Sequence, residues 1–590
     1  MKKFFFRFFA VVGALVVVAL LVGAVFALAG TALRPGVPDR VLLEVDLERP
    51  VVEDKPDDPV ASAILGDAAP LRDLIEGLEV AAKDERVGAL VARLGATDMG
   101  MATAQELRDA VLAFRAGGKK AIAWAETFGE FGPGNTAYYL ATAFDEIYLL
   151  PSGDVGLTGV ILESPFLAGT LEKVGLVPRM GQRHEYKNAM NIFTEREFTA
   201  AHEEAMRGIA SAWHRQLLEG IAAGRGKSAE EARALVDRGP FLGAEALEAG
   251  LVDGMAYRDE VYEKAEAAAG ASAERLSLAK YLERAGRPHE KGTAIALVYG
   301  VGGVARGKSD FNPLTGQFTM GSDTVARALR DAVEDDEVKA ILFRVDSPGG
   351  SYVASDAIWR ETERARAAGK PLVVSMGDVA GSGGYFVAMA ADKIVAQPGT
   401  ITGSIGVLGG KFLTQGMWSK LGVSWDEVHE GAAATLWTGL ADYDPAQWQR
   451  FQAWLDRVYD DFTAKVAKGR NLPRETVFEI AKGRIWSGAD AHRLGLVDAL
   501  GGMDVALRLA REQAGIAPDA AIELKRFPKR KTPLQALLAQ LGNGNETATV
   551  ALVEALETVR PLARLAARLG VTGEPRDALA LPASALDEPR

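Results

Sequence analysis

Two glycine-rich turns in the second half of the chain could hold a nucleophile beside an oxyanion site. They follow predicted strands and read Asp-Ser-Pro-Gly-Gly at 346–350 and Gly-Ser-Gly-Gly-Tyr at 381–385. Glycines let a backbone turn sharply and leave its N–H groups uncovered. Ser382, at the start of a predicted helix, could expose its hydroxyl there, and the N–H groups of Gly350 and Gly383 could stabilise an oxyanion. The same pattern also fits a strand-to-helix turn without chemistry.

A nucleophilic serine needs a base, and the chain offers few histidines. There are only 6 of them, at 184, 202, 214, 289, 429 and 492. None lies in a glycine-rich or strand-end context like that of Ser382. The other workable base is a neutral lysine whose pKa is lowered by burial.

The chain contains an internal repeat. Three pairs of segments match at a nearly constant offset of about 247 residues: 84–90 with 335–341, 138–147 with 385–394, and 250–253 with 495–498. Two copies of one domain are therefore predicted in tandem, at 40–290 and 291–515. A C-terminal extension at 516–590 follows them and carries no recognisable chemistry.

The repeat indicates a candidate base. In the repeat alignment Lys187 is opposite Ala432, and Ser382 is opposite Asn135. The first copy thus has the lysine without the serine, and the second has the serine without the lysine. This complementary loss is what one dyad split between the copies would produce. The alternative is that Lys187 is an ordinary solvated lysine.

Each copy is predicted to have an α/β fold. In the second copy, short apolar runs at 294–299, 340–345 and 371–375 are typical of buried strands, and 351–368 between them is helix-like. Strands that alternate with helices indicate a largely parallel sheet. Long amphipathic helices are expected at 202–223 and 447–466.

The N-terminus is typical of a membrane anchor. Lys2, Lys3 and Arg7 precede an uncharged stretch from Phe8 to Leu33. About 20 apolar residues span a bilayer, whereas the core of a signal peptide has about 7–15. We expect a cytoplasmic tail at 1–7, a transmembrane helix at 8–33, and the rest of the chain outside the inner face. A signal peptide cleaved after Ala27-Leu28-Ala29 is the alternative.

Composition excludes several classes of function. The 590 residues include no cysteine, so disulfides, thiolate metal sites and a cysteine nucleophile are excluded. The net charge of -12 argues against a protein that binds nucleic acid. The sequence also lacks the H-E-x-x-H zinc motif. We expect no metal and no cofactor.

Taken together, the motifs resemble the long form of the signal peptide peptidase A family, also called protease IV. The resemblance rests on Ser-Pro-Gly-Gly at 347–350, Ala-Gly-Ser-Gly-Gly-Tyr at 380–385, Thr-Gly-Ser-Ile-Gly at 402–406 and Tyr-Lys-Asn-Ala at 186–189. It implies tandem ClpP/crotonase-like domains and a Ser/Lys dyad. Ser382 would be the nucleophile, Lys187 the general base and Ser404 the residue that orients the lysine. Gly350 and Gly383 would supply the oxyanion N–H groups.

The resemblance also implies a location and a substrate. Members are bacterial inner (cytoplasmic) membrane proteins with the catalytic domains on the periplasmic side. They assemble as homotetramers and degrade remnant signal peptides and other apolar peptides. No cofactor is implied.

Four other functions fit single features. Residues 302–309 match the P-loop pattern of ATPases, but the residues that follow suggest a loop where a helix is needed. An α/β-hydrolase would use His429 or His492 as its base. A non-enzymatic membrane scaffold would explain the serine missing from the first copy. A crotonase-type enzyme would have little access to acyl-CoA outside the cytoplasm.

Overall fold

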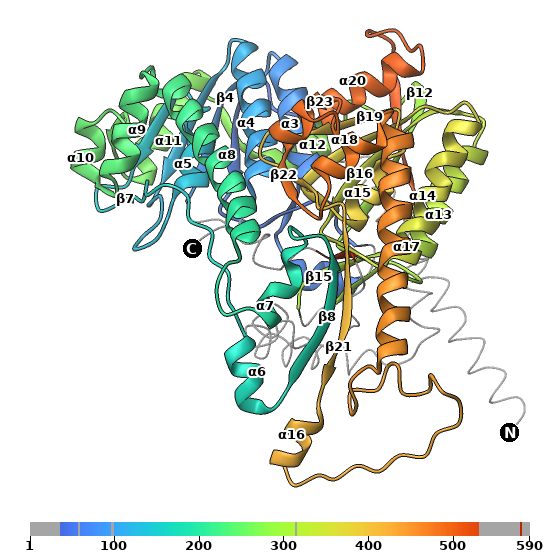
Figure 1. Ribbon diagram of the computed structural model, residues 1–590. Helices are drawn as coiled ribbons and strands as arrows, with labels where there is room; N and C mark the ends of the chain where they lie inside the picture. Colours follow the sequence, from blue (N-terminus) through green and yellow to red (C-terminus); the bar gives the residue numbers. More distant parts are fainter. Residues whose placement is uncertain (1–35, 57–58, 96–98, 313–314, 530–578, 581–590) are drawn as a thin grey trace, which may run out of the picture.

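The computed structural model describes residues 36–56, 59–95, 99–312, 315–529 and 579–580 (Figure 1). The predicted tail at 1–7, the predicted anchor at 8–33 and most of the extension at 516–590 lie outside these residues. Within the described part of the chain, no helix is long and apolar enough to cross a membrane.

The first repeat is built on a sheet of six strands that are all parallel. Its order is β10-β6-β5-β4-β1-β11. The strands are β1 (Val41–Asp46), β4 (Val87–Leu94), β5 (Lys120–Ala125), β6 (Glu146–Leu149), β10 (Gly254–Met255) and β11 (Glu274–Ser277). Apolar runs such as that of β4 form buried strands because both faces of a parallel sheet are covered by helices.

The second repeat has the same strand order, which confirms the tandem duplication. Its sheet runs β23-β19-β18-β16-β12-β24, and an edge formed by β20 and β22 branches from β18. All neighbours are parallel except β20 and β22. The strands are β12 (Thr293–Val301), β16 (Val338–Ser347), β18 (Leu372–Gly381), β19 (Lys393–Ala396), β20 (Ile401–Gly403), β22 (Ile485–Ser487), β23 (Ala499–Leu500) and β24 (Ile522–Phe527).

The second sheet extends beyond the boundary expected at residue 515. Strand β24 pairs along β12, from Thr293 opposite Ile522 to Val298 opposite Phe527. Residues 522–527 therefore belong to the folded repeat, because a parallel edge strand shares the hydrogen bonds and the core of its sheet. The basic residues Lys525 and Arg526, which the sequence suggested as part of an appendage, lie on this strand.

Helices cover both faces of each sheet. One face is covered by α11 (Arg258–Ala269) in the first repeat and by α20 (Met503–Gln513) in the second. The other face carries the longer helices α3 (Leu71–Lys83), α4 (Met101–Ala116), α8 (Ala200–Arg225), α13 (Ser322–Glu334), α14 (Tyr352–Ala367) and α17 (Pro445–Arg470). Residues of β12 alternate between the two faces, as strand geometry requires. The predicted helices at 202–223, 351–368 and 447–466 are confirmed.

Shorter elements connect these layers. The short helices are α2 (Pro59–Leu65), α5 (Asn135–Ala141), α7 (Asn191–Thr194), α9 (Ala229–Arg238), α10 (Gly243–Glu248), α12 (Leu278–Ala285), α15 (Gly383–Ala388), α18 (Arg474–Ile480), α19 (Gly488–Arg493) and the 3-10 turn η1 (Asn188–Met190). The short strands are β2 (Val51–Val52), β3 (Ala69–Pro70), β7 (Asp154–Val155), β9 (Phe241–Leu242), β13 (Gly303–Ala305), β14 (Asp310–Asn312), β15 (Gln317–Gly321), β17 (Gly349–Gly350) and β25 (Leu579–Ala580). Since β14 directly follows Lys308-Ser309, no helix opens there to bind phosphate, and the P-loop interpretation is wrong.

Both repeats contribute to a projecting arm. Strand β8 (Val177–Arg183) of the first repeat pairs antiparallel with β21 (Val407–Leu413) of the second. The arm consists of these strands, α6 (Ala168–Val174), α16 (Gln415–Lys420) and the loop 421–443, and it extends below the two sheets in Figure 1. Lys187 follows β8, and Ser404 precedes β21, so this pairing brings the two segments together.

Candidate active site

Ser382 lies at a sharp turn between strand β18 and helix α15. Its φ of 55° and ψ of -114° are strained for a residue other than glycine. The turn is held because the Ser382 N–H donates to the carbonyl of Gly403 at 2.8 Å. The sequence suggested an exposed hydroxyl, but the side chain is fully buried. It faces Lys187 instead of the surface.

Lys187 is the hydrogen-bond partner of that serine. Its Nζ lies 2.7 Å from Ser382 Oγ and 3.0 Å from both Oγ and the carbonyl oxygen of Ser404. The side chain is 1% exposed. Burial lowers the pKa of Lys187 to about 7, because removing a charged group from water favours its neutral form. Near neutral pH a large fraction of the amine is therefore free to accept a proton.

The loop that carries Lys187 is fixed by a segment of the second repeat. The Tyr186 N–H donates to the carbonyl of Lys482 at 3.2 Å. Gly483 has a φ of 82°, and a Cβ atom on it would lie only 2.6 Å from Lys187 N. No other residue fits there without displacing the lysine. Sequence reasoning missed Gly483, because only the folded chain brings residue 483 next to residue 187.

Ser404 completes the contacts of the lysine amine. Its own N–H donates to the carbonyl of Arg484 at 2.7 Å, and the Gly483 N–H donates to the carbonyl of Ile405 at 2.8 Å. The segments 404–405 and 483–484 therefore support each other beside Lys187. With Ser382 Oγ, the two Ser404 oxygens fix the direction in which the amine points.

The two predicted oxyanion glycines lie against each other beside Ser382. A Cβ atom on Gly383 would lie 3.0 Å from Gly350 N and 2.7 Å from Ser355 Oγ. Gly350 has a φ of 151°, and its own Cβ would lie 2.2 Å from the carbonyl oxygen of Val304. The Gly383 N–H is in the first turn of α15, where helix N–H groups lack intrahelical acceptors. The backbone N–H groups of the two glycines thus lie close together next to the nucleophile, as an oxyanion site requires.

All five residues predicted for the site come together, from both repeats. Lys187 comes from the first, and Ser382, Ser404, Gly350 and Gly383 come from the second. The two histidines considered as bases have other neighbours. His492 Nδ1 lies 3.2 Å from the carbonyl oxygen of Val497, and His429 lies beside Glu427 in the exposed part of the arm. A buried amine, a serine hydroxyl and two backbone donors are the groups needed for acyl transfer.

Comparison with known proteins agrees with this chemistry. The model of peptidase family S49 matches residues 113–272 and 364–517, one stretch in each repeat. The chain is 30% identical over 486 residues to "Serine protease SPPA, chloroplastic" of Arabidopsis thaliana, covering 80% of this chain and 70% of that protein. It is 32% identical over 438 residues to "Protease 4" of Haemophilus influenzae, covering 70% of this chain and 68% of that one. A "Protease 4" of Salmonella typhi is 32% identical over 457 residues, with coverages of 75% and 72%.

Proposed function

The chain belongs to peptidase family S49 and is a serine peptidase, and we propose that Ser382 is its nucleophile and Lys187 its general base. The observation that carries this assignment is the 2.7 Å contact between Lys187 Nζ and Ser382 Oγ inside a buried site. A lysine can act as a base only when it is neutral, and burial supplies that condition here.

The reaction then follows from the positions of the atoms. Neutral Lys187 accepts the proton of Ser382 Oγ as this oxygen attacks the peptide carbonyl. The Gly350 and Gly383 N–H groups donate to the carbonyl oxygen as it becomes negative. The lysine ammonium returns the proton to the leaving amine, and an acyl-enzyme forms. Lys187 next removes a proton from water, which attacks the ester and releases the acid.

Extended backbone can pair with the oxyanion turn, which supports a peptide as the substrate. Strand β25 pairs antiparallel with β17, with Gly349 opposite Ala580 and Gly350 opposite Leu579. A peptide bound in this manner gains main-chain hydrogen bonds, while its side chains decide selectivity. Its carbonyl would be presented beside Ser382.

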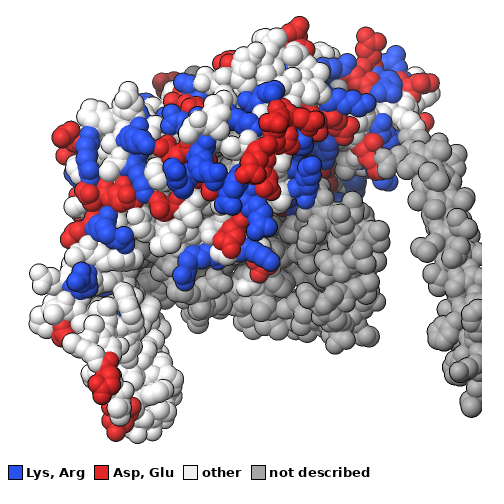
Figure 2. Space-filling view, turned by 90° about the vertical axis from the view of Figure 1, so that its right-hand side faces the viewer, with Lys and Arg blue, Asp and Glu red and all other residues white. Residues whose placement is uncertain are grey.

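We propose that the substrates are apolar, in particular remnant signal peptides released into the membrane. The arm supports this idea, because its surface shows few charged side chains compared with the body (Figure 2). Its exposed apolar residues are Val174, Val177, Leu421, Val423, Trp425, Val428 and Trp437. Exposed apolar patches of this kind mark contacts with apolar partners.

We also propose how the chain is placed in the membrane and how its copies assemble. Residues 1–7 form a cytoplasmic tail, 8–33 anchor the chain in the bacterial inner membrane, and the two repeats lie on the periplasmic side. The repeats are of ClpP/crotonase type, at 40–290 and from 291 onward, and the extension ends at 590. Four copies assemble into a homotetramer.

The first prediction concerns pH. Because the neutral amine is the reactive form, kcat/KM is expected to rise with pH through about 7 and to reach a plateau above it. Rates of hydrolysis of a fluorogenic peptide between pH 5 and pH 9 test this, with fluorescence of the free product as a control. A rate independent of pH over this range would contradict a lysine base.

The second prediction concerns substrate class. The full chain in detergent is expected to cleave a peptide with a leucine- and alanine-rich core at least about tenfold faster, in kcat/KM, than a peptide of equal length with serines in that core. Mass spectrometry of the products identifies the cleaved bonds. Equal rates for the two peptides would remove the proposed preference, although the serine peptidase chemistry would stand.

A third prediction concerns the proposed anchor. The full chain is expected to float with phospholipid vesicles after an alkaline wash, and recovery in the soluble fraction would contradict the anchor.

A further inference from the structure

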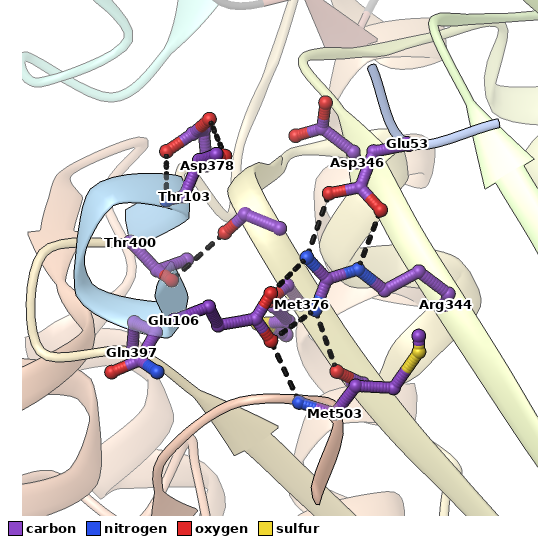
Figure 3. Close-up of polar contacts among 12 residues, drawn as sticks. Glu53, Thr103, Glu106, Arg344, Asp346, Met376, Asp378, Gln397, Thr400 and Met503 are labelled. Atoms are coloured by element: carbon purple, nitrogen blue, oxygen red, sulfur yellow. Dashed lines mark hydrogen bonds and ion pairs between the residues drawn. The ribbon is translucent and has the colours of Figure 1, made fainter. Parts of the chain in front are cut away.

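Five ionisable side chains gather where the two repeats meet, on or beside the strands that lead to the dyad (Figure 3). Arg344 is the centre of this buried charge cluster and is 1% exposed. Its guanidinium donates to Glu53 at 2.7 Å and to Glu106 at 2.8 Å, both from the first repeat. Asp346 and Asp378 of the second repeat complete the cluster. Four buried carboxyl groups thus lie around one guanidinium, which pairs directly with two of them, Glu53 and Glu106.

The cluster surrounds an irregularity in strand β18. Val345 of β16 pairs with Met376, but Ser347 pairs with Ala380. One residue of β16 therefore faces three residues of β18, Gly377 to Val379, and these form a bulge. Bulges bend a strand and redirect the side chains that follow. Ser382 lies three residues beyond this bulge.

The two aspartates hold the bulge from opposite sides. Asp346 Oδ1 accepts a hydrogen bond from the Val379 N–H at 2.9 Å. Asp378, inside the bulge, accepts the Thr103 N–H at 2.9 Å and the Thr103 hydroxyl at 2.6 Å. Thr103 is in the first turn of α4, whose N-cap Gly100 provides no side-chain acceptor. Asp378 of the second repeat thus caps a helix of the first.

The bulge packs closely against Asp346 and Glu53. A Cβ atom on Gly377 would lie 2.9 Å from both Asp346 Cβ and Glu53 Oε1, so the two acidic side chains approach the same backbone position. Burial, together with the charges of Glu53 and Asp378, raises the pKa of Asp346 to about 8. An asparagine could therefore replace this largely protonated acid with little electrostatic change.

The bulge belongs to the repeat that carries the serine. In the first repeat, the ladder between β4 and β5 runs from Ala89 opposite Lys120 to Leu94 opposite Ala125 and ends there. That repeat has Asn135 at the position of Ser382. In the second repeat, the ladder continues past the equivalent pair, Val345 opposite Met376, through the bulge to Ser347 opposite Ala380, and Ser382 follows it.

We propose that Asp346, Asp378 and Thr103 are positioning residues: they fix the bulge at 377–379, and through it the place of Ser382 relative to Lys187 and the oxyanion turn. The first repeat then contributes twice to the site, with the base and with the helix α4 that secures the nucleophile strand. This inference rests on the proposed role of Ser382.

The first test compares substitutions of Asp346. Asp346→Ala is expected to lower the rate at which a small fluorophosphonate labels Ser382 by about 10- to 100-fold, with a similar fall in peptide kcat and little change in KM. Asp346→Asn is expected to restore both rates to within about threefold of wild type, because its amide oxygen still accepts the Val379 N–H.

The matched control lies at the other end of the same strand. Asp392 accepts the Leu372 N–H of β18 at 2.8 Å, far along the strand from Ser382. Asp392→Ala is expected to lower thermal stability without slowing the labelling. Equal slowing by Asp346→Ala and Asp392→Ala would overturn the proposal, and so would labelling of Asp346→Ala at the wild-type rate.

The second test uses the contact between the repeats and a substitution that preserves folding. Thr103→Val replaces only the hydroxyl by a methyl group and is expected to slow labelling about three- to tenfold. Thr362 is a buried threonine whose hydroxyl donates within its own helix. Its variant Thr362→Val is the control and is expected to be labelled at the wild-type rate. Asp378→Asn should slow labelling similarly, and the double variant should be no slower than the slower single variant. Additive effects, or a wild-type rate for Thr103→Val, would overturn the link through α4.

The Ser382→Ala variant separates failure of this inference from failure of the proposed function. If Ser382→Ala still hydrolyses peptides, the proposed function fails. If it is inactive and the variants of Asp346, Asp378 and Thr103 behave like wild type, only this inference fails.

Discussion

Lys187→Met is expected to abolish peptidase activity and, near neutral pH, to make the folded chain more stable. Without the amine, no group remains to accept the proton of Ser382, and kcat/KM should fall by at least about 10³-fold. The methionine side chain has a similar length and fills the same buried space. Because it carries no charge, it also removes the energetic cost of burying an ionisable amine.

The sign of the stability effect follows from the pKa of Lys187. In the unfolded chain its pKa is near 10.5, and burial lowers it to about 7. Between these values the unfolded state binds the extra proton, so wild-type stability rises with pH across this window. The cost to the wild-type fold is about 4 kcal/mol at pH 7 and about 5 kcal/mol well below it, and it disappears above about pH 10.5. The advantage of the variant should shrink in the same way.

Thermal unfolding at several pH values, together with peptide hydrolysis, tests both parts. The melting temperature of Lys187→Met should exceed that of wild type by a few degrees at pH 7 and match it near pH 10.5. Lys119→Met is a suitable control, because the pKa of Lys119 is also lowered by burial while its amine donates to the carbonyl of Ala81 at 2.6 Å. That variant should keep its activity. An active Lys187→Met would show that the base is elsewhere.

Ser382→Ala should remove both hydrolysis and covalent labelling, with a loss of at least about 10³-fold. The Ser382 hydroxyl lies beside both the Lys187 amine and the oxyanion glycines, as the nucleophile of an acyl-enzyme must. The variant should fold like wild type. Its backbone strain at residue 382 should be unchanged, because a φ of 55° is as unfavourable for alanine as for serine. Residual hydrolysis through the oxyanion donors alone would be slow.

Labelling by a fluorophosphonate, followed by mass spectrometry, locates the reactive serine directly. Wild type should carry one label on the peptide that contains Ser382, and the variant none. Ser419→Ala, on the surface of α16, should be labelled at the wild-type rate. A label on another serine, or turnover by Ser382→Ala, would contradict the assigned nucleophile.

Much of this architecture was accessible from the sequence because duplication preserves spacing. A nearly constant offset between segments such as 138–147 and 385–394 requires the same order of elements in both copies, and the two sheets have that order. The same alignment predicted that Lys187 and Ser382 complement each other. Long periodic helices were also predicted correctly, because an amphipathic stripe over many residues is a strong signal.

Other features depend on contacts that no local pattern encodes. Gly483 is essential only because the folded chain brings it against Lys187. Asp346 directly precedes Ser-Pro-Gly-Gly, and a charged residue at the end of an apolar strand could have drawn attention to it. Its partners Glu53 and Asp378 could not have been identified. The boundary at 515 was too early because β24 is short and half-polar and becomes a strand through pairing with β12.

The division of the dyad between the repeats also controls when activity can arise. Chains are synthesised from the N-terminus, and domains generally fold in that order. Lys187 would emerge early, but the residues that bury it, Ser404 and Gly483, are made more than 200 residues later. Until they arrive, the lysine is solvated and keeps its proton, with a pKa near 10.5. We therefore expect a growing chain to be inactive until the second repeat is complete, because only then do the proposed base and nucleophile meet.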